Sequence, residues 1–384
     1  MDFSLTSEEQ ELQQRVRRLA EEEIAPIAAE VDESNRVSPE LMEILGRANL
    51  FRYNVPQEYG GYGIKVVRLC IIREELARVS AQADTNFIMQ GLGSYPITLG
   101  GTPEQKARYL PPIASGEAIA AFALTEPHGG SDVAGMKTTA SMMKSGEDEE
   151  WVLNGEKKFI SQAGDASTYV VFAKTDPAAG SRGISAFIVE KGTPGFDDSR
   201  RMSLMAPHPI GEPRFENCRI AYASLIGERG HGLRLALRTL DTFRTTVAAA
   251  AVGMGQAAYE AALDYARDRT MFGQKLSDFQ ATQFKLADMA VSLDAARLLA
   301  YRAAWLKDSG QEMVIKEASF AKLFATEAAT RIVNESLQIH GGAGLQKGSR
   351  IERLYREVRA LTIYEGTSEI QRQTIARQLL RENR

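Results

Sequence analysis

The chain is poor in the residues that build disulfide frameworks and zinc sites. Its 384 residues include two cysteines, Cys70 and Cys218, and four histidines with no metal-ligand spacing. Charge of one sign is not in excess either, because 46 lysines and arginines stand against 50 aspartates and glutamates. The formal charge of −4 argues against a surface dedicated to nucleic acid. We therefore expect two buried cysteines, no bound metal and no nucleic-acid partner.

Long apolar runs are missing as well. No stretch approaches the length that spans a bilayer, and the alanine-rich run 247–258 predicts a tightly packed core helix instead. The residues from Met1 to Leu5 have neither the basic nor the apolar region of a signal peptide. The composition, 44% apolar and 25% charged, suits a globular protein with a large core. We expect a cytoplasmic protein of two or three domains with no membrane partner.

Periodicity separates three regions along the chain. Residues 1–120 predict a helical domain, opened by a capping box that starts at Ser7. Residues 121–230 predict a middle antiparallel β domain, with strands at 169–172 and 184–189 and a hairpin turn at Asn154-Gly155. Because no long helices alternate with these strands, a βαβ nucleotide fold is excluded. Residues 231–384 predict a C-terminal four-helix bundle, with helices over 233–268, 279–309, 314–340 and 368–381.

The segment 361–372 is the most informative part of the chain. Gly366 interrupts a helical pattern, and Ser368 with Gln371 predicts a capping box that opens a new helix. Glu365 is therefore expected on a short connection between two helices. Most glutamates are solvated surface charge. A carboxylate held at such a break is instead a candidate general base.

Three further segments are compatible with ligand binding, and each has a plainer interpretation. In 122–135, two glycines would let backbone N–H groups approach a ligand, although the segment also suits a β-turn with His128 as a turn residue. Arg269 can grip a pyrophosphate and Phe272 can pack on a ring, but a helix end at Gly273 explains the same residues. The glycines of 341–344 suit either a helix end or the close approach of a cofactor, and beside them His340 suits either a hydrogen bond to that site or packing.

Taken in order, six motifs resemble the acyl-CoA dehydrogenase family over essentially the whole chain. They are Thr-Glu-Pro-x-Gly-Gly-Ser-Asp, Phe-Ile-Ser, Leu-Asp-x-x-Arg, Arg-x-x-Phe-Gly, Gln-x-x-Gly-Gly and Tyr-Glu-Gly-Thr-Ser-Glu-Ile-Gln-Arg. The resemblance implies the three domains above, a homotetramer and one FAD per subunit. It implies the oxidation of an acyl-CoA thioester to the 2-enoyl-CoA, with Glu365 removing the α proton and flavin N5 taking the β hydride. An electron-transferring flavoprotein would then accept the electrons.

The resemblance also implies a set of binding residues. Leu124, Thr125 and Ser131 match flavin contacts, and Phe159 and Ser161 match residues that flank the flavin ring. The positions that match contacts to the FAD pyrophosphate and adenosine, some reaching a neighbouring subunit, are Arg269, Phe272, Gln280, Gln338 and Gly342. Thr367 and Glu369 match cofactor contacts beside the base. The substrate-binding positions are Ser131, Asp241, Arg244, Tyr364, Glu365 and Gly366, of which Asp241 and Arg244 match the CoA side.

Several alternatives stay open from the sequence. Some relatives carry the base just before the arginine of Leu-Asp-x-x-Arg, but here that residue is Phe243, which cannot accept a proton. An acyl-CoA oxidase that uses dioxygen keeps the same fold, and a non-enzymatic helical scaffold is the third alternative. The helices of 71–96 are expected to floor the acyl pocket. Polar Asp84 and Gln90 there indicate either an alicyclic or functionalised acyl group, or positions that face solvent.

Overall fold

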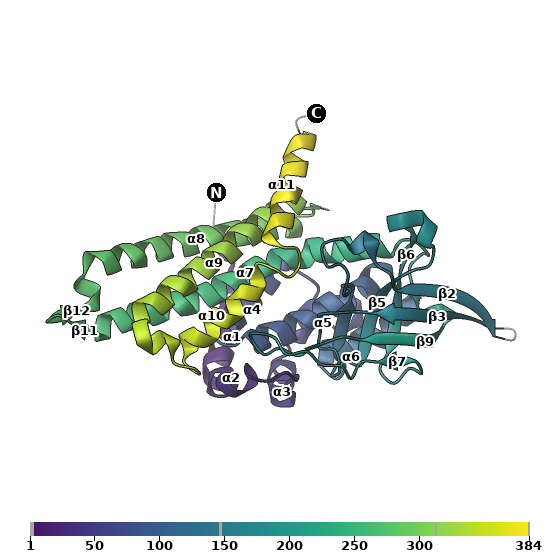
Figure 1. Cartoon of the computed structure of the whole chain (residues 1–384), viewed down its shortest axis with the longest axis horizontal. Coiled ribbons are helices and arrows are strands. Elements are labelled where there is room, and N and C mark those ends of the chain that lie inside the picture. The colour runs from purple at the N-terminus through teal and green to yellow at the C-terminus, as the bar shows by residue number, and fades with distance from the viewer. Residues whose placement is uncertain (1–3, 146–147, 312, 383–384) are drawn as a thin grey trace. The chain divides into compact units, whose positions relative to one another are not determined.

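The computed structural model describes residues 4–145, 148–311 and 313–382, and its contacts divide the chain into two compact units (Figure 1). The helical unit comprises Met1–Asp32, Lys65–Asp84 and Asp241–Arg384. The sheet unit comprises Glu33–Ile64 and Thr85–Leu240. Along the chain, helices precede strands and long helices follow them, so the predicted fold class is confirmed. The domain limits at residues 120 and 230 stay a prediction.

Long helices make up most of the helical unit. They are α1 (Ser7–Leu19), α2 (Ala25–Val31), α4 (Val66–Ala77), α7 (Gly232–Asp268), α8 (Gln280–Asp308), α9 (Ile315–His340), α10 (Arg350–Leu361) and α11 (Ser368–Glu382), with α7 entering from the sheet unit. A short hairpin of β11 (Thr270–Met271) and β12 (Gln274–Lys275) links α7 to α8. The helices α8 and α9 run side by side (Figure 1). The four long helices that the sequence predicts in this region are therefore confirmed.

Small side chains let these helices pack closely. Alanines of α7, α8 and α9 are fully buried in one hydrophobic core, as the run 247–258 predicts. At Gly253 of α7, an added Cβ would lie 2.2 Å from the backbone oxygen of Glu74 in α4, so only glycine fits there. The core is thus built around α7, which also carries Asp241 and Arg244.

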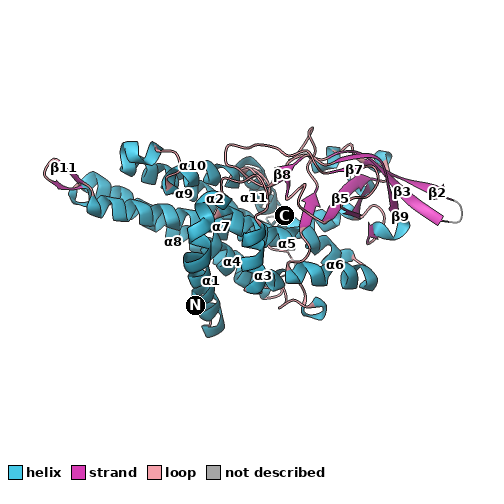
Figure 2. Ribbon diagram, turned by 90° about the horizontal axis from the view of Figure 1, so that it is seen from below, coloured by secondary structure: helices cyan, strands magenta, loops and turns pink. Residues whose placement is uncertain are grey.

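A mixed sheet dominates the sheet unit (Figure 2). Its main strands are β1 (Ala120–Ala123), β2 (Thr139–Ser145), β3 (Asp148–Glu156), β5 (Thr168–Lys174), β6 (Ile184–Glu190), β7 (Phe196–Asp197), β9 (Arg214–Ala221) and β10 (Leu225–Ile226). The strand order is β10-β6-β5-β2-β3-β9-β7, with β1 beside β5. Most pairs are antiparallel, as predicted, but β1·β5 and β2·β5 are parallel, which the sequence did not predict.

Three helices and a second small sheet complete this unit. The helices are α3 (Pro39–Arg47), α5 (Ala81–Gly100), which begins in the helical unit, and α6 (Pro103–Ser115). The second sheet pairs β4 (Ile160–Ser161) with β8 (Ile210–Gly211). The main core contains Trp151, Tyr169 and Phe187. Both cysteines are free and buried, as predicted.

The predicted hairpin turn at Asn154-Gly155 is wrong. Both residues lie inside β3, where Asn154 pairs with Thr139 and Gly155 pairs with Phe215. The register shifts between Leu153 and Gly155, and Gly155 has a φ of +142°. The glycine therefore marks a β-bulge, the other role that a glycine in a strand serves.

The first predicted cap is displaced by one residue. Thr6, not Ser7, is the N-cap of α1: its hydroxyl accepts from the Glu9 backbone N–H at 3.3 Å, and its own N–H donates to the Glu9 carboxylate at 2.8 Å. Thr6 and Glu9 satisfy the spacing of a capping box, and Ser7 becomes the first helical residue. Among the residues described, no helix is long and apolar enough to cross a bilayer.

Candidate active site

The predicted base lies on the connection between two helices, as the sequence indicates. α10 ends at Leu361 and α11 begins at Ser368, and Glu365 stands between them. Glu365 has a φ of +51°, in the left-handed region, and Gly366 follows with a φ of +95°. A non-glycine residue in that region costs on the order of 1–3 kcal/mol and persists only where its surroundings enforce it. The surroundings of Glu365 must therefore hold this backbone in place.

Three side chains grip the two carbonyl groups of this connection. Arg244 Nε of α7 donates to the Glu365 carbonyl at 3.0 Å, and Lys322 Nζ of α9 donates to the Gly366 carbonyl at 2.8 Å. Gln371 Nε2 of α11 donates to both, at 3.2 and 2.9 Å. A Cβ added at Gly366 would lie 2.6 Å from that amide nitrogen. The glycine therefore lets the amide approach, and three helices fix the position of Glu365.

These contacts correct the second predicted capping box. The Ser368 hydroxyl is buried and has no hydrogen-bond partner among the described residues, and Gln371 points to the carbonyls of 365 and 366. The N-cap is Thr367, whose hydroxyl accepts from the Ile370 N–H at 3.3 Å. Thr367 spends its hydroxyl on the helix, while the predicted cofactor contact Glu369 is exposed on the first turn of α11.

The carboxylate of Glu365 is poised to take a proton. Its Oε2 atom is buried and no hydrogen-bond donor reaches it from the described residues. Burial raises the pKa of this carboxyl above its usual range, and the positive charges of Arg73, Arg244 and Lys322 counteract part of that rise. A raised pKa and an oxygen without a donor are what a general base at neutral pH requires.

Two buried cations near Glu365 lie outside all of the motifs found in the sequence. Lys322 is fully buried, and burial lowers its pKa to about 8. Arg73 of α4 is also buried and forms an ion pair with Asp84. Each cation interrupts an apolar pattern, because Lys322 lies between Ala321 and Ala325 and Arg73 follows Cys70, Ile71 and Ile72. A charged residue within an apolar pattern is therefore the signal in the sequence that could have indicated Arg73 and Lys322.

The predicted CoA-side residues lie on the same face of α7 as this connection. Besides Arg244, whose contact is given above, Asp241 is buried and its Oδ2 accepts from Lys307 Nζ at 2.9 Å. Its Oδ1 atom has no partner among the described residues. Tyr364 and Gly366 flank Glu365 directly, so the structure brings five of the predicted substrate residues into one region of the helical unit.

The Thr-Glu-Pro segment of the sheet unit forms a turn, which is the plainer of the two interpretations of its sequence. Glu126 and Gly129 bond each other through their backbones, at 3.4 and 3.2 Å. The buried Glu126 carboxylate pairs with Lys157 Nζ at 2.8 Å and accepts from the N–H groups of Lys137 and Thr138. Lys157 also donates to the Leu124 carbonyl at 3.3 Å. The glutamate thus anchors the loop that carries Leu124, Thr125 and, further on, exposed Ser131.

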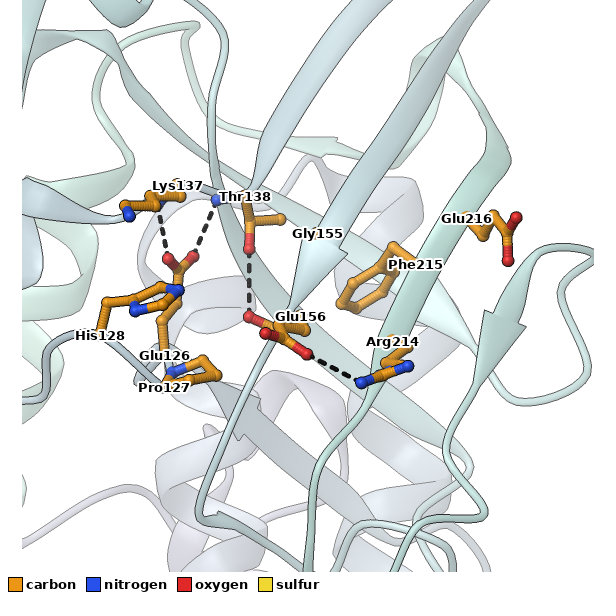
Figure 3. Close-up of a pocket in the computed structure, with 10 residues that line it drawn as sticks. All are labelled: Glu126, Pro127, His128, Lys137, Thr138, Gly155, Glu156, Arg214, Phe215 and Glu216. Carbon is orange, nitrogen blue, oxygen red and sulfur yellow. Dashed lines mark hydrogen bonds and ion pairs between the residues drawn. The ribbon is translucent and has the colours of Figure 1, made fainter.

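A cavity of about 460 Å³ opens beside this turn (Figure 3). Its lining residues are Glu126, Pro127, His128, Lys137, Thr138, Gly155, Glu156, Arg214, Phe215 and Glu216. Glu156 pairs with Arg214 at 3.3 Å across it. Its walls carry both signs of charge and none of the predicted site residues, so we do not assign the cofactor to it. Exposed His128 lies on its rim as a residue of the turn, as predicted.

The two residues predicted to flank the flavin ring lie side by side at the second small sheet. Phe159 has a φ of +57° and an exposed side chain, with Lys158 Nζ 5.5 Å from its ring centre. Ser161 Oγ lies 3.3 Å from His208 Nε2. Burial lowers the pKa of His208 to about 4, so the imidazole is neutral at physiological pH. No motif in the sequence indicates a role for His208.

The remaining predicted cofactor residues gather at the far end of α9. This hairpin-end set consists of Arg269, Phe272, Gln280, Gln338 and Gly342. The His340 ring stacks on Tyr265 of α7 with ring centres 4.4 Å apart and bonds the Ser336 carbonyl at 2.7 Å, so its role here is packing. His340 lies eighteen residues beyond Lys322 on α9. At a rise of 1.5 Å per residue, that is about 27 Å along the helix from the region of the base.

The hairpin-end set suits a large polar ligand with a ring. Phe272 is 92% exposed and has a φ of +50°, and a Cβ added at Gly342 would meet nothing within 4 Å. A guanidinium and two amides supply hydrogen-bond donors, and the oxygens of a pyrophosphate and a ribose accept hydrogen bonds from such donors. Hydroxyls of Thr125 and Ser131 and the exposed ring of Phe159 add donors and a ring in the sheet unit. The residues present therefore fit FAD, and in the described part of the chain no cluster of His, Cys, Asp and Glu is arranged to hold a metal.

Comparison with known proteins identifies the class of this fold as a family of oxidoreductases. Family models for the N-terminal, middle and C-terminal domains of acyl-CoA dehydrogenases match residues 6–117, 121–218 and 230–380. The chain belongs to the acyl-CoA dehydrogenase family, whose cofactor is FAD.

Individual relatives match over almost their whole length. The probable acyl-CoA dehydrogenase FadE25 of Mycobacterium tuberculosis is 41% identical, over 99% of this chain and 97% of the relative. The mitochondrial short-chain specific acyl-CoA dehydrogenase of Bos taurus is 43% identical, over 98% of this chain and 90% of the relative.

Solved structures match equally well. Butyryl-CoA dehydrogenase from Megasphaera elsdenii is 35% identical with a TM-score of 0.93, covering 99% of this chain and 100% of the other. A chain from the work on the electron transferring flavoprotein of Acidaminococcus fermentans is 39% identical with a TM-score of 0.94, covering 99% and 100%. The structure described as PigA with FAD and proline is 28% identical with a TM-score of 0.91 and covers 99% of both chains.

Proposed function

We propose that the chain oxidises an acyl-CoA thioester to the 2-enoyl-CoA, with Glu365 as the base that removes the α proton. The observation that supports this role is the carboxylate itself: Oε2 is buried without a donor, burial raises the pKa, and Arg244, Lys322 and Gln371 hold its backbone. When bound, FAD supplies the acceptor for the β hydride. Leu124, Thr125, Ser131, Phe159, Ser161, Thr367, Glu369 and the hairpin-end set are the residues that would hold it.

The backbone at Glu365 offers a second contribution. The N–H groups of Ile363 and Tyr364 both donate to the Ala360 carbonyl, at 2.9 and 3.1 Å, whereas that of Glu365 has no acceptor in the described part of the chain. An α proton of a thioester is very weakly acidic, so the charge that develops on the thioester oxygen must be stabilised. We infer that the Glu365 N–H donates to that oxygen while its carboxylate removes the proton.

Replacement of Glu365 by glutamine tests this proposal. General-base catalysis contributes roughly 10²–10⁴ in rate, so Glu365→Gln is expected to lower turnover at least about 100-fold. The flavin absorbance of the purified variant should stay at the wild-type level, because the change is isosteric. Glu40→Gln, at an exposed position of α3, is the matched control and should turn over like the wild type. Near-normal turnover by Glu365→Gln would refute the assignment.

The acyl group is proposed to carry a ring or a polar function. Asp84 and Gln90 are both buried, so the alternative that these positions face solvent is wrong. Gln90 Oε1 accepts from the Ala120 N–H at 3.0 Å, and its amide nitrogen has no partner among the described residues. Turnover of linear, branched, dicarboxylic and alicyclic acyl-CoAs tests the proposal. A preference for acyl chains with neither a ring nor a polar group would contradict it.

For the electron acceptor we propose an electron-transferring flavoprotein, and the structural match to a chain from work on such a flavoprotein supports it. Rapid oxygen uptake by the reduced enzyme would favour the acyl-CoA oxidase instead. A protein that purifies without flavin absorbance would favour a scaffold. Location in the cytoplasm stays a prediction, which fractionation of the source cells tests.

We also propose that the protein assembles as a homotetramer. Apolar side chains exposed on one stripe of α8 recur every seven residues, at Phe284, Val291, Leu298 and Trp305. An exposed apolar stripe at helical spacing is typical of a helix that packs on another subunit. The distance of the hairpin-end set from Glu365 supports the same proposal, because residues about 27 Å away along α9 suit the cofactor of a neighbouring copy.

A further inference from the structure

A buried ion pair joins two helices next to the base. Arg73 of α4 donates through Nε and Nη2 to the two carboxylate oxygens of Asp84 in α5, at 2.7 and 2.6 Å. Both side chains are 2% exposed. The two parallel hydrogen bonds form the forked geometry that only an arginine provides. The pair therefore has a fixed orientation, unlike a salt bridge on the surface.

The same guanidinium reaches two further elements. Its Nη1 donates to the Thr246 hydroxyl of α7 at 2.9 Å, two residues after Arg244. Its positive charge also counteracts the rise that burial causes in the pKa of the phenol of Tyr364, the residue directly before Glu365. One side chain thus joins α4, α5 and α7, and its charge acts on the connection that carries Glu365. Because Nε, Nη1 and Nη2 each donate to Asp84 or Thr246, the guanidinium is held in one orientation.

Five groups determine the electrostatic environment of the Glu365 carboxylate. The cations are Arg73 of α4, Arg244 of α7 and Lys322 of α9, and the anion is Asp84 of α5. The fifth group is the neutral phenol of Tyr364, whose pKa burial raises. Arg73 counteracts the rise in the Glu365 pKa more than either other cation, and Asp84 adds to the rise. The two members of the ion pair therefore act on Glu365 in opposite directions.

Stability alone does not explain such a pair. Burying two charges costs about as much as their attraction returns, and apolar replacements are often equally stable. The better explanation for this ion pair is that its charges act on a neighbouring group.

We propose that Arg73 is a positioning residue for the reaction: held by Asp84 and Thr246, it keeps a fixed positive charge beside the Tyr364–Glu365 connection and determines the pH at which Glu365 becomes a competent base. This inference rests on the proposed role of Glu365. Arg73 lies outside the six motifs of the sequence. Arg73 and Asp84 are expected to have opposite effects on the pH dependence of Glu365.

The test compares Arg73→Gln with Asp84→Asn in the FAD-loaded protein. Loss of an opposite charge near a carboxylate shifts its pKa by roughly 1–3 units, so Arg73→Gln should move the acidic limb of kcat/KM upward by about one pH unit or more. Asp84→Asn should move it downward. Arg17→Gln is the matched control, because it breaks another forked pair in the helical unit, from Arg17 to buried Glu75 at 2.9 and 2.7 Å. That variant should lose stability without moving the limb.

A direct measurement separates this inference from the proposed function. The infrared band of the protonated Glu365 carboxyl, identified by its absence in Glu365→Gln, is titrated in each variant without turnover. Opposite shifts of this band in Arg73→Gln and Asp84→Asn support the inference even if no acyl-CoA is oxidised. Shifts in one direction for both variants, or no shift beyond that of Arg17→Gln, would overturn it.

Discussion

Lys322 Nζ donates to the Gly366 carbonyl at 2.8 Å from a fully buried position, and no carboxylate of the described residues forms a salt bridge with it. Its charge is instead balanced at longer range, with Glu365 the strongest contributor. The ammonium therefore serves the connection that carries the base, and two consequences can be measured.

Lys322→Met removes this donor and is expected to slow turnover by roughly 10- to 100-fold. A hydrogen bond to a charged group contributes about 1.5–3 kcal/mol, and its loss frees the Gly366 carbonyl to move with Glu365. Gln371 Nε2 remains bonded to that carbonyl, so the variant should still fold and bind FAD. Steady-state kinetics at pH 7 check the prediction, and unchanged turnover would contradict it.

The same variant should lose a pH dependence of stability. Burial lowers the pKa of Lys322 to about 8 from 10.5, so the folded state binds fewer protons than the unfolded state between these values. The free energy of unfolding therefore increases as pH rises above about 8. The increase from this group amounts to roughly 3 kcal/mol by pH 10.5. Urea unfolding of wild type and Lys322→Met between pH 7.5 and 9.5 should show the gap between them change with that slope.

For Asp32 we predict the opposite effect in the acid range, where the free energy of unfolding should fall as pH rises. Burial raises the pKa of this carboxyl to about 6 from 3.8, so the folded state binds the proton more tightly. Stability from this group is present below about pH 4 and is lost as pH rises through about 6. Asp32→Asn keeps an oxygen for the Ser80 hydroxyl and the Gln82 N–H, which bond the same Oδ1 at 2.6 and 3.0 Å.

Asp32→Asn should therefore be more stable than wild type at pH 7, by up to roughly 3 kcal/mol, and equal to it near pH 4. Urea unfolding at pH 4, 5, 6 and 7 measures the difference. Ser80→Ala is a useful comparison, since it removes one hydrogen bond to the carboxylate and should act in the opposite direction at pH 7. A constant difference across pH for Asp32→Asn would show that its charge is not the cause.

The position of Glu365 was predictable because local signals and tertiary contacts agree there. A glycine, a hydroxyl residue and the end of a helical pattern place Glu365 on a connection, and the structure has it there. The contacts that hold it come from Arg244, Lys322 and Gln371, which are far apart in sequence. No local pattern contains a pairing of that kind, and only the packing of α7, α9 and α11 produces it.

Where local signals failed, a tertiary contact had overridden them. Asn154-Gly155 has the composition of a hairpin turn, yet pairing with β9 keeps the strand going and turns the glycine into a bulge. Ser368 has the composition of an N-cap, but Thr367 takes that role because Gln371 is drawn to the carbonyls beside the base. The buried partners Arg73 and Asp84 lie eleven residues apart on different helices, outside the reach of helical periodicity.

The apolar stripe of α8 predicts how assembly can be broken. Val291 is 70% exposed at the middle of the stripe, so Val291→Glu would bury a charge in any interface that covers it. We expect light scattering to show a smaller species for this variant. Gln14→Glu adds the same charge at an exposed position of α1 and should leave the mass unchanged. A full-sized Val291→Glu assembly would show that α8 is not the contact surface.

The left-handed backbone at Glu365 leads to a prediction that is independent of catalysis. Alanine at a φ of +51° keeps the steric conflict of its Cβ, whereas glycine relieves it. Glu365→Gly should therefore be more stable to urea than Glu365→Ala, by about 1 kcal/mol, although glycine also gives the unfolded chain more freedom. Both variants lack the carboxylate, so its burial cancels in the comparison. In the helix α11, the same pair of substitutions at exposed Gln373 should give the reverse order, since glycine is the poorer helix former. If alanine proves the more stable residue at both positions, the connection does not hold Glu365 in a strained conformation.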